Sequence, residues 1–103
     1  MKVIVSERAE INLHKTADYI QKEFGQKAKK EFLQEIRHLI GLLTTNPYMW
    51  AIEPLLAEFP STYRSFVVKR LSKIVYRIVD DCIEISDFWD CRRNPDALIA
   101  QLK

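Results

Sequence analysis

The chain has few of the residues on which metal and cofactor chemistry is usually built. Its 103 residues include two glycines, two histidines and two cysteines. Gly25 and Gly41 stand too far apart to form a glycine-rich phosphate loop. His14 and His38 fall in separate segments and lack the spacing of metal ligands. The sequence therefore predicts no metal site and no cofactor.

Long apolar runs and a strong excess of one charge are also missing. No stretch approaches the roughly 20 apolar residues that span a bilayer, and the apolar run near the N-terminus is too short for a signal peptide. We therefore expect a cytoplasmic protein without a membrane partner. The net charge of +2 predicts no general affinity for nucleic acid, so any polyanion site must be local.

The two cysteines are expected to be reduced. Cys82 and Cys91 are predicted to open and close one strand. At about 3.3 Å per residue, their Cα atoms would lie well beyond the separation that a disulfide allows.

A regular succession of elements is present, and the length and the apolar content of 48% indicate one domain over residues 1–103. Apolar steps of three and four residues predict two helices, one capped by Ser6 and ending at Gly25, the other ending before Pro47. Strands are predicted at 2–5, 63–68, 73–80 and 83–89, and a short helix at 95–103. The predicted fold is α+β, an antiparallel β-sheet with an N-terminal helical hairpin packed on one face, in the order β-α-α-β-β-β-α.

Charge is segregated along residues 64–90. Five cations come first and five acids follow: Arg64, Lys69, Arg70, Lys73, Arg77, then Asp80, Asp81, Glu84, Asp87, Asp90. Opposite charges on neighbouring strands commonly pair, and exposed pairs of this kind contribute little stability. We expect Glu84 and Asp87 to take up part of the charge of Arg77 and Lys73.

The face of the sheet away from the helices is the candidate binding surface. Alternation along the middle strand places Ile74 and Tyr76 beneath the helices. The opposite, open face would then present the following side chains to a target or partner: Arg64, Phe66, Lys73, Val75, Arg77. Because this face is partly apolar, an acidic-apolar peptide is expected to cover it, and the free chain is expected to dimerise. Arg92 and Arg93 follow the last strand in a loop, where functional residues often lie.

Several short sequence motifs, in their order along the chain, resemble those of the RelE/ParE superfamily. Its members are the toxins of bacterial type II toxin–antitoxin modules of the plasmid-stabilisation type. The motifs are SERAE at 6–10, YR at 63–64, IVYRI at 74–78 and DCRRNP at 90–95. The resemblance covers the whole chain and implies a single toxin domain neutralised by a cognate antitoxin. RelE-like members cut messenger RNA on the ribosome without a metal, whereas ParE-like members trap DNA gyrase with its DNA cleaved.

The resemblance also implies roles for single residues. Lys73 stands where RelE-like nucleases carry a phosphate-contacting arginine, Arg64 matches a basic position, and Arg92 or Arg93 matches the arginine after the last strand. Two features depart from the nuclease pattern. Phe66 replaces a lysine, and residues 94–103 lack the expected tyrosine. General acids and bases are worth about 10² to 10⁴ in rate, so this chain resembles the ParE side more closely.

Three hypotheses follow from these residues. The leading one is a ParE-like toxin, not itself an enzyme, that inhibits DNA gyrase. The alternative is a ribosome-dependent messenger RNase that uses Arg64, Lys73 and Arg92 or Arg93. The third is a degenerate domain that binds its antitoxin without toxicity.

Overall fold

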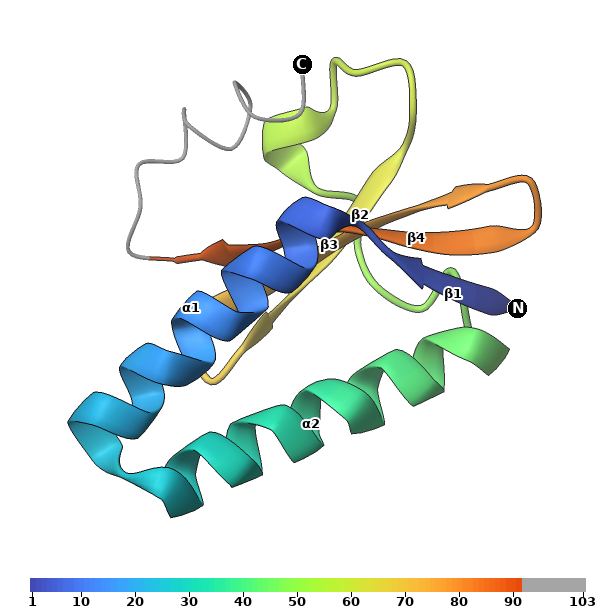
Figure 1. The fold of residues 1–103 in the computed structure, drawn as a ribbon. Helices are drawn as coiled ribbons and strands as arrows, with labels where there is room; N and C mark the ends of the chain where they lie inside the picture. Colours follow the sequence, from blue (N-terminus) through green and yellow to red (C-terminus); the bar gives the residue numbers. More distant parts are fainter. Residues whose placement is uncertain (92–103) are drawn as a thin grey trace.

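The computed structural model describes residues 1–91, which form an α+β fold (Figure 1). The elements are β1 (Lys2–Val5), α1 (Glu7–Phe24), α2 (Gln26–Thr45), the 3₁₀ helix η1 (Pro54–Leu56), β2 (Tyr63–Val68), β3 (Ser72–Val79) and β4 (Cys82–Asp90). The predicted order β-α-α-β-β-β is confirmed. The helix predicted at 95–103 lies outside the described residues, as do Arg92 and Arg93.

The sheet is mixed, with the strand order β1-β4-β3-β2. The meander from β2 to β4 is antiparallel as predicted, but β1 pairs with β4 in parallel. The parallel pairing is possible because residues 6–81, which include both helices and two strands, separate β1 from β4, and parallel neighbours need a connection of a dozen or more residues. None of the described helices is long and apolar enough to cross a membrane.

The start of α1 is fixed by Ser6. Its hydroxyl oxygen accepts a hydrogen bond from the backbone N–H of Ala9 at 3.1 Å, which is the predicted N-cap. The hydroxyl donates to the carbonyl of Ser86 at 3.0 Å, and the Ser6 N–H donates to the carbonyl of Ile85 at 3.0 Å. One residue therefore begins the helix and ties it to β4.

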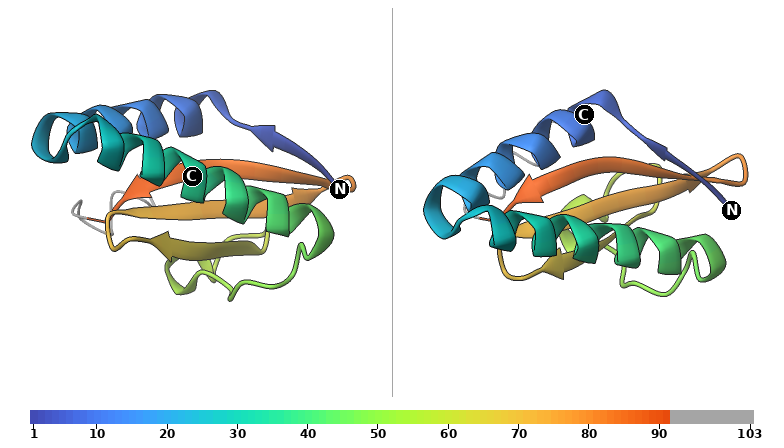
Figure 2. Two further views of the ribbon diagram at one scale, coloured as in Figure 1. Left: turned by 90° about the horizontal axis from the view of Figure 1, so that it is seen from below. Right: turned by 60° about the horizontal axis from the view of Figure 1, so that its bottom comes forward.

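Both helices cover the same face of the sheet (Figure 2). The core beneath them contains Phe32, Ile36, Ile74, Tyr76 and Ile85, all with at most 2% of their surface exposed. The prediction that Ile74 and Tyr76 lie beneath the helices is confirmed.

The opposite face is not open, which corrects the sequence interpretation. Residues 46–62 cross the edge of the sheet and cover part of this face (Figure 2). A second apolar cluster forms there from Leu56, Tyr63, Val75 and Trp89, with Phe59 packed against it. Val75 is fully buried. We call residues 46–62 the connector. It contains three prolines, and it contributes apolar side chains that bury part of the second face.

Arg64 and Phe66 lie on the helix-covered face, contrary to the prediction that they share a face with Lys73 and Arg77. Arg64 pairs across the ladder with Tyr76, and Phe66 pairs with Ile74. Directly opposite residues of an antiparallel pair point to the same face. Alternation within one strand gives its two faces, but it does not give the register against the neighbouring strand.

We expect Gly25→Ala to lower the free energy of unfolding by about 1–3 kcal/mol, because Gly25 joins α1 to α2 in a region of φ and ψ that is essentially restricted to glycine. Its φ is +96° and its ψ is 171°. An added Cβ would meet no atom within 4 Å, so the cost lies in the backbone alone. Gly41→Ala, inside α2 and equally free of clashes, should instead raise stability by up to about 1 kcal/mol. Urea unfolding measures both, and equal effects would contradict this account.

Candidate functional site

The cations predicted to form one site are divided between the two faces of the sheet. Lys73 and Arg77 lie two positions either side of the buried Val75, on the face that the connector covers. Arg64 lies opposite Tyr76 on the helix-covered face. The structure therefore does not bring these three side chains together.

Lys73 is held by a buried carboxylate. Its ammonium donates to Oε1 of Glu53, and their side chains are only 14% and 3% exposed. Glu53 also accepts hydrogen bonds from the hydroxyl of Ser65 at 3.1 Å and from the N–H of Leu55 at 2.9 Å. Asp87 was expected to take up part of the charge of Lys73, but the acid in the ion pair of Lys73 is Glu53. Asp87 is buried and accepts a hydrogen bond from Nδ2 of Asn12 at 2.7 Å.

The pKa of Glu53 lies below its ordinary value. Burial works to raise this pKa, but the hydrogen bond and charge of Lys73, together with the N–H of Leu55 and the hydroxyl of Ser65, outweigh it. Glu53 is therefore a carboxylate at neutral pH and neutralises Lys73.

Arg77 is also paired, as predicted. Its Nε donates to Oε1 of Glu84 at 3.0 Å, and Nη1 donates to the hydroxyl of Ser61 at 2.9 Å. The guanidinium carbon lies 5.7 Å from the ring centre of Tyr63. The hydrogen bond with Glu84 raises the pKa of Arg77 further.

Arg64 and Tyr76 hold the first part of the connector. Nη1 of Arg64 donates to the carbonyl of Trp50 at 2.7 Å, and its guanidinium carbon lies 5.4 Å from the ring centre of Tyr48. The hydroxyl of Tyr76 donates to the carbonyl of Pro47 at 2.8 Å. Burial raises the pKa of Tyr76, although the charge of Arg64 opposes the shift.

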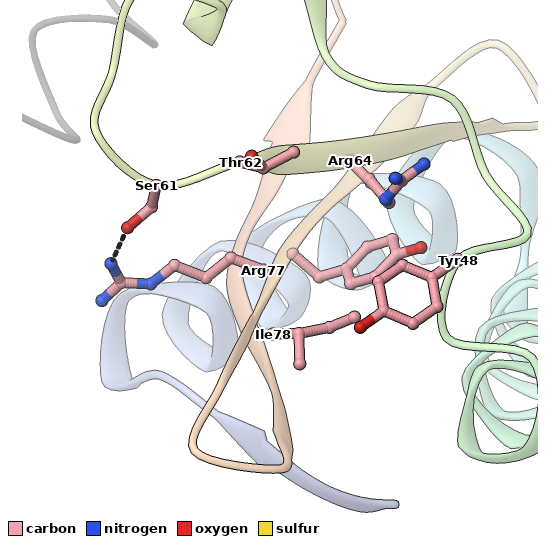
Figure 3. Close-up of a pocket in the computed structure, with 7 residues that line it drawn as sticks. Tyr48, Ser61, Thr62, Arg64, Arg77 and Ile78 are labelled. Carbon is pink, nitrogen blue, oxygen red and sulfur yellow. Dashed lines mark hydrogen bonds between the residues drawn. The ribbon is translucent and has the colours of Figure 1, made fainter.

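A cleft of about 310 Å³ opens at the start of β2. It is lined by Tyr48, Ser61, Thr62, Arg64, Tyr76, Arg77 and Ile78. Figure 3 shows the guanidinium groups of Arg64 and Arg77 extending to opposite ends of this cleft. The two arginines therefore do not converge on one point. Within residues 1–91, no group of three or more His, Cys, Asp or Glu side chains is placed to hold a metal ion.

The sequence model of one protein family matches almost the whole chain. This family, described as the ParE toxin of the type II toxin–antitoxin system parDE, matches residues 3–95. The chain belongs to the ParE toxin family.

A solved structure has the same fold as this ParE-family toxin. It is titled as a chromosomal ParDE TA system from P. aeruginosa, and it matches with a TM-score of 0.71 and 19% sequence identity over 87% of this chain and 95% of that chain. At this identity the likeness concerns the fold. No curated protein sequence matches the chain.

Three contacts in this ParE-family toxin were missed by sequence reasoning, and all involve the connector. Glu53 binds Lys73, Tyr48 lies beneath Arg64, and Trp50 stacks on Phe66 with ring centres 4.8 Å apart. Trp50 is 6% exposed and packs in the core cluster beneath the helices. The sequence held one indication that Glu53 pairs with a cation of the sheet. Only two acids, Glu53 and Glu58, occur between residues 46 and 79.

Glu53→Ala should lower the free energy of unfolding of the toxin by about 3–5 kcal/mol, because it leaves the mostly buried Lys73 without a partner. The matched control is Glu84→Ala. This change breaks the Arg77 pair, whose side chains are about one-third exposed, and it should cost at most about 1 kcal/mol. Chemical denaturation measures both values, and a loss for Glu53→Ala no larger than the control's would contradict the buried-pair account.

The same pair predicts a pH dependence. A carboxyl whose pKa is lower in the folded state contributes stability that is fully present above its unfolded pKa, here 4.5, and is lost as pH falls through the folded pKa. Between about pH 7 and about pH 3, wild-type toxin should therefore lose more stability than Glu53→Gln. Unfolding free energies measured at several pH values test this, and parallel curves for the two proteins would refute it.

Proposed function

We propose that this ParE-family toxin acts in the bacterial cytoplasm by binding DNA gyrase and trapping it with its DNA cleaved, and that a cognate antitoxin neutralises it. The observation that carries the proposal is the family match over residues 3–95, together with the internal contacts of Arg64, Lys73 and Arg77, which lie on two faces of the sheet. The nuclease alternative would need Arg64 and Lys73 together on one RNA-binding surface, whereas a protein target does not.

The contacts of Lys73 and Arg64 argue against a nuclease. Phosphate binding by both would require them on one surface, but they lie on opposite faces and Lys73 is neutralised by Glu53. Phe66, which stands where the resemblance expects a lysine, stacks on Trp50 and has no proton to transfer.

Tyr76 is equally unsuited to acid–base work. Its hydroxyl is bonded to a backbone carbonyl of the connector, it is fully buried, and burial raises its pKa. A general acid or base must reach the reacting group and have a pKa near the working pH. These contacts support a binding protein more than a ribonuclease.

Different contact residues are proposed for the two partners. We assign Arg92 and Arg93 to gyrase, because the sequence predicts a loop after the last strand and loops are a common place for function. Arg64 and Phe66 are assigned to the antitoxin. Val75 and Lys73, expected from the sequence to bind a partner, act in this proposal by holding the connector.

In a gyrase cleavage assay, purified toxin should increase linear DNA once the trapped complex is denatured and digested with protease. The double variant Arg92→Glu/Arg93→Glu should weaken trapping at least about tenfold, since like-charge juxtaposition at an interface costs several kcal/mol. The matched control, Lys27→Glu/Lys30→Glu at exposed positions of α2, makes the same change in net charge and should trap as wild type does.

Two outcomes would overturn the proposal. One is unchanged supercoiling and cleavage at a high excess of folded toxin. The other is the appearance of new 5′ ends in translated messenger RNA that Lys73→Ala abolishes, which would assign the chain to the ribosome-dependent nucleases. A strain that grows normally when the toxin is induced without antitoxin would instead indicate a domain that has lost toxicity.

A further inference from the structure

The outer edge of β2 is only half covered. β2 is an edge strand of the sheet, and residues 51–53 pair with its first half. The Glu53 N–H donates to the Tyr63 carbonyl at 2.8 Å, and the Ser65 N–H donates to the Ala51 carbonyl at 3.1 Å. Successive residues of a strand point their backbone groups to alternate sides. The carbonyl of Ser65 and both backbone groups of Val67 therefore face outward beyond this pairing.

These outward groups have no partner in the part of the chain that the structure describes. No hydrogen bond joins the carbonyl of Ser65 or the N–H and carbonyl of Val67 to any of residues 1–91 outside the β2–β3 ladder. Unpaired groups on an edge strand are a template for another strand. β2 can thus accept an extended peptide beside Val67.

The side chains around this edge form a partly apolar surface with one arginine. We call it the β2-edge surface and define it as Tyr48, Ile52, Arg64, Phe66 and Val67. Its apolar members are from 40% to 65% exposed. Ile52 forms an isolated antiparallel β-bridge with Arg64, so their side chains lie on the same face of the sheet. Phe66 follows Arg64 by two positions in β2 and shares that face.

Arg64 is already held in place for an incoming acid. The carbonyl of Trp50 and the ring of Tyr48 fix its guanidinium, so little side-chain freedom is lost when a carboxylate binds. Arginine and aromatic residues also dominate the binding energy of many protein interfaces.

The charge around the β2-edge surface is of one sign. Residues 46–52 and 60–79 contain no acid, and the nearest one, Glu53, is buried against Lys73. Lys69 and Arg70, in the turn after β2, are exposed and form no ion pair with any residue from 1 to 91. An occupant that carries carboxylates is therefore favoured.

We propose that an extended acidic-apolar segment of the cognate antitoxin adds to the free end of β2 as a new strand. It hydrogen-bonds to Ser65 and Val67, places a carboxylate on Arg64 and packs an apolar side chain on Phe66. Because Arg64 and Phe66 lie on the same face of the sheet, the segment must carry its acid and its apolar residue on one face, an even number of positions apart. This inference rests on the proposed function only for the identity of the partner.

Two other occupants fit the observations less well. A second copy of the chain, paired through β2, would bring together two sets of cations around Arg64, Lys69 and Arg70, which is unfavourable. A nucleic-acid strand would meet those cations, but it would leave the aliphatic side chain of Ile52 and the backbone groups of Val67 without matching groups.

The test uses the full chain labelled with ¹⁵N and three probes. These are a capped octapeptide of repeating Val–Val–Asp–Asp (the Val–Asp peptide), its counterpart of repeating Val–Val–Lys–Lys (the Val–Lys peptide), and an octanucleotide of uridine. The Val–Asp peptide should shift the Val67 amide resonance, slow its hydrogen exchange and bind at least about tenfold more tightly than the Val–Lys peptide. Equal binding of the two peptides, or binding of the oligonucleotide alone, would overturn the proposal.

Two pairs of variants separate the backbone contribution from the charge contribution. Val67→Pro removes the outward N–H and should abolish Val–Asp binding, whereas Val67→Ala keeps the N–H and should reduce it only slightly. Lys69→Glu/Arg70→Glu should weaken Val–Asp binding at least about tenfold, while Lys27→Glu/Lys30→Glu should leave it unchanged. If Val67→Pro fails to fold, the exchange rate of the Val67 amide in the wild type still decides the backbone contact.

A last experiment uses the whole cognate antitoxin. If it binds and neutralises wild type, Phe66→Glu and Lys69→Glu/Arg70→Glu equally well, the edge inference is wrong and the proposed function stands. If no complex forms with wild type, the antitoxin part of the proposed function fails, and the peptide titration still tests the edge on its own. Sedimentation of the free chain gives one more outcome, since a dimer that Val67→Pro dissociates would assign the edge to a second copy.

Discussion

The contact between Glu53 and Lys73 is the interaction on which the rest of the site depends. It joins the connector to β3 across the edge of the sheet, and both side chains are nearly removed from water. An isolated charge in that position would be strongly unfavourable, so the connector stays in place only while both partners are present. Its position in turn allows Leu56 to cover Val75 and lets Trp50 stack on Phe66.

The polar side chains of β2 and β3 mainly fasten this connector. Arg64 and Tyr76 hold its beginning through the carbonyls of Trp50 and Pro47, and Arg77 holds its end through Ser61. A row of cations that resembles a phosphate-binding strip in the sequence is thus largely occupied by internal acceptors. What remains accessible is the outer edge of β2, where backbone groups and apolar side chains lie beside an arginine that is already ordered.

Local sequence patterns predicted the elements of this fold, because caps, turns and periodicity act over a few residues. As expected, α1 begins after Ser6 and ends before Gly25. Glu84 pairs with Arg77, also as expected, because the two-residue turn after Val79 fixes the register of the β3–β4 hairpin. Contacts across different elements were not predictable in this way. A register shift between Val75 and Tyr76 changes which residues of β4 lie opposite β3, and the partner of Lys73 lies 20 residues away on a segment without periodicity.

The parallel pairing of β1 with β4 has a consequence for how the toxin is made. β4 lies between β1 and β3, and it packs against α1, yet among the strands of residues 1–91 it is the last to leave the ribosome. Contacts between Ser6 and residues 85–86 span about 80 positions of the sequence, and contacts this distant form slowly. The first strand cannot pair, and α1 cannot complete the burial of its apolar face, before β4 is present. Synthesis through β4 therefore precedes completion of the fold, and a shortened product that lacks β4 cannot acquire the toxin's structure.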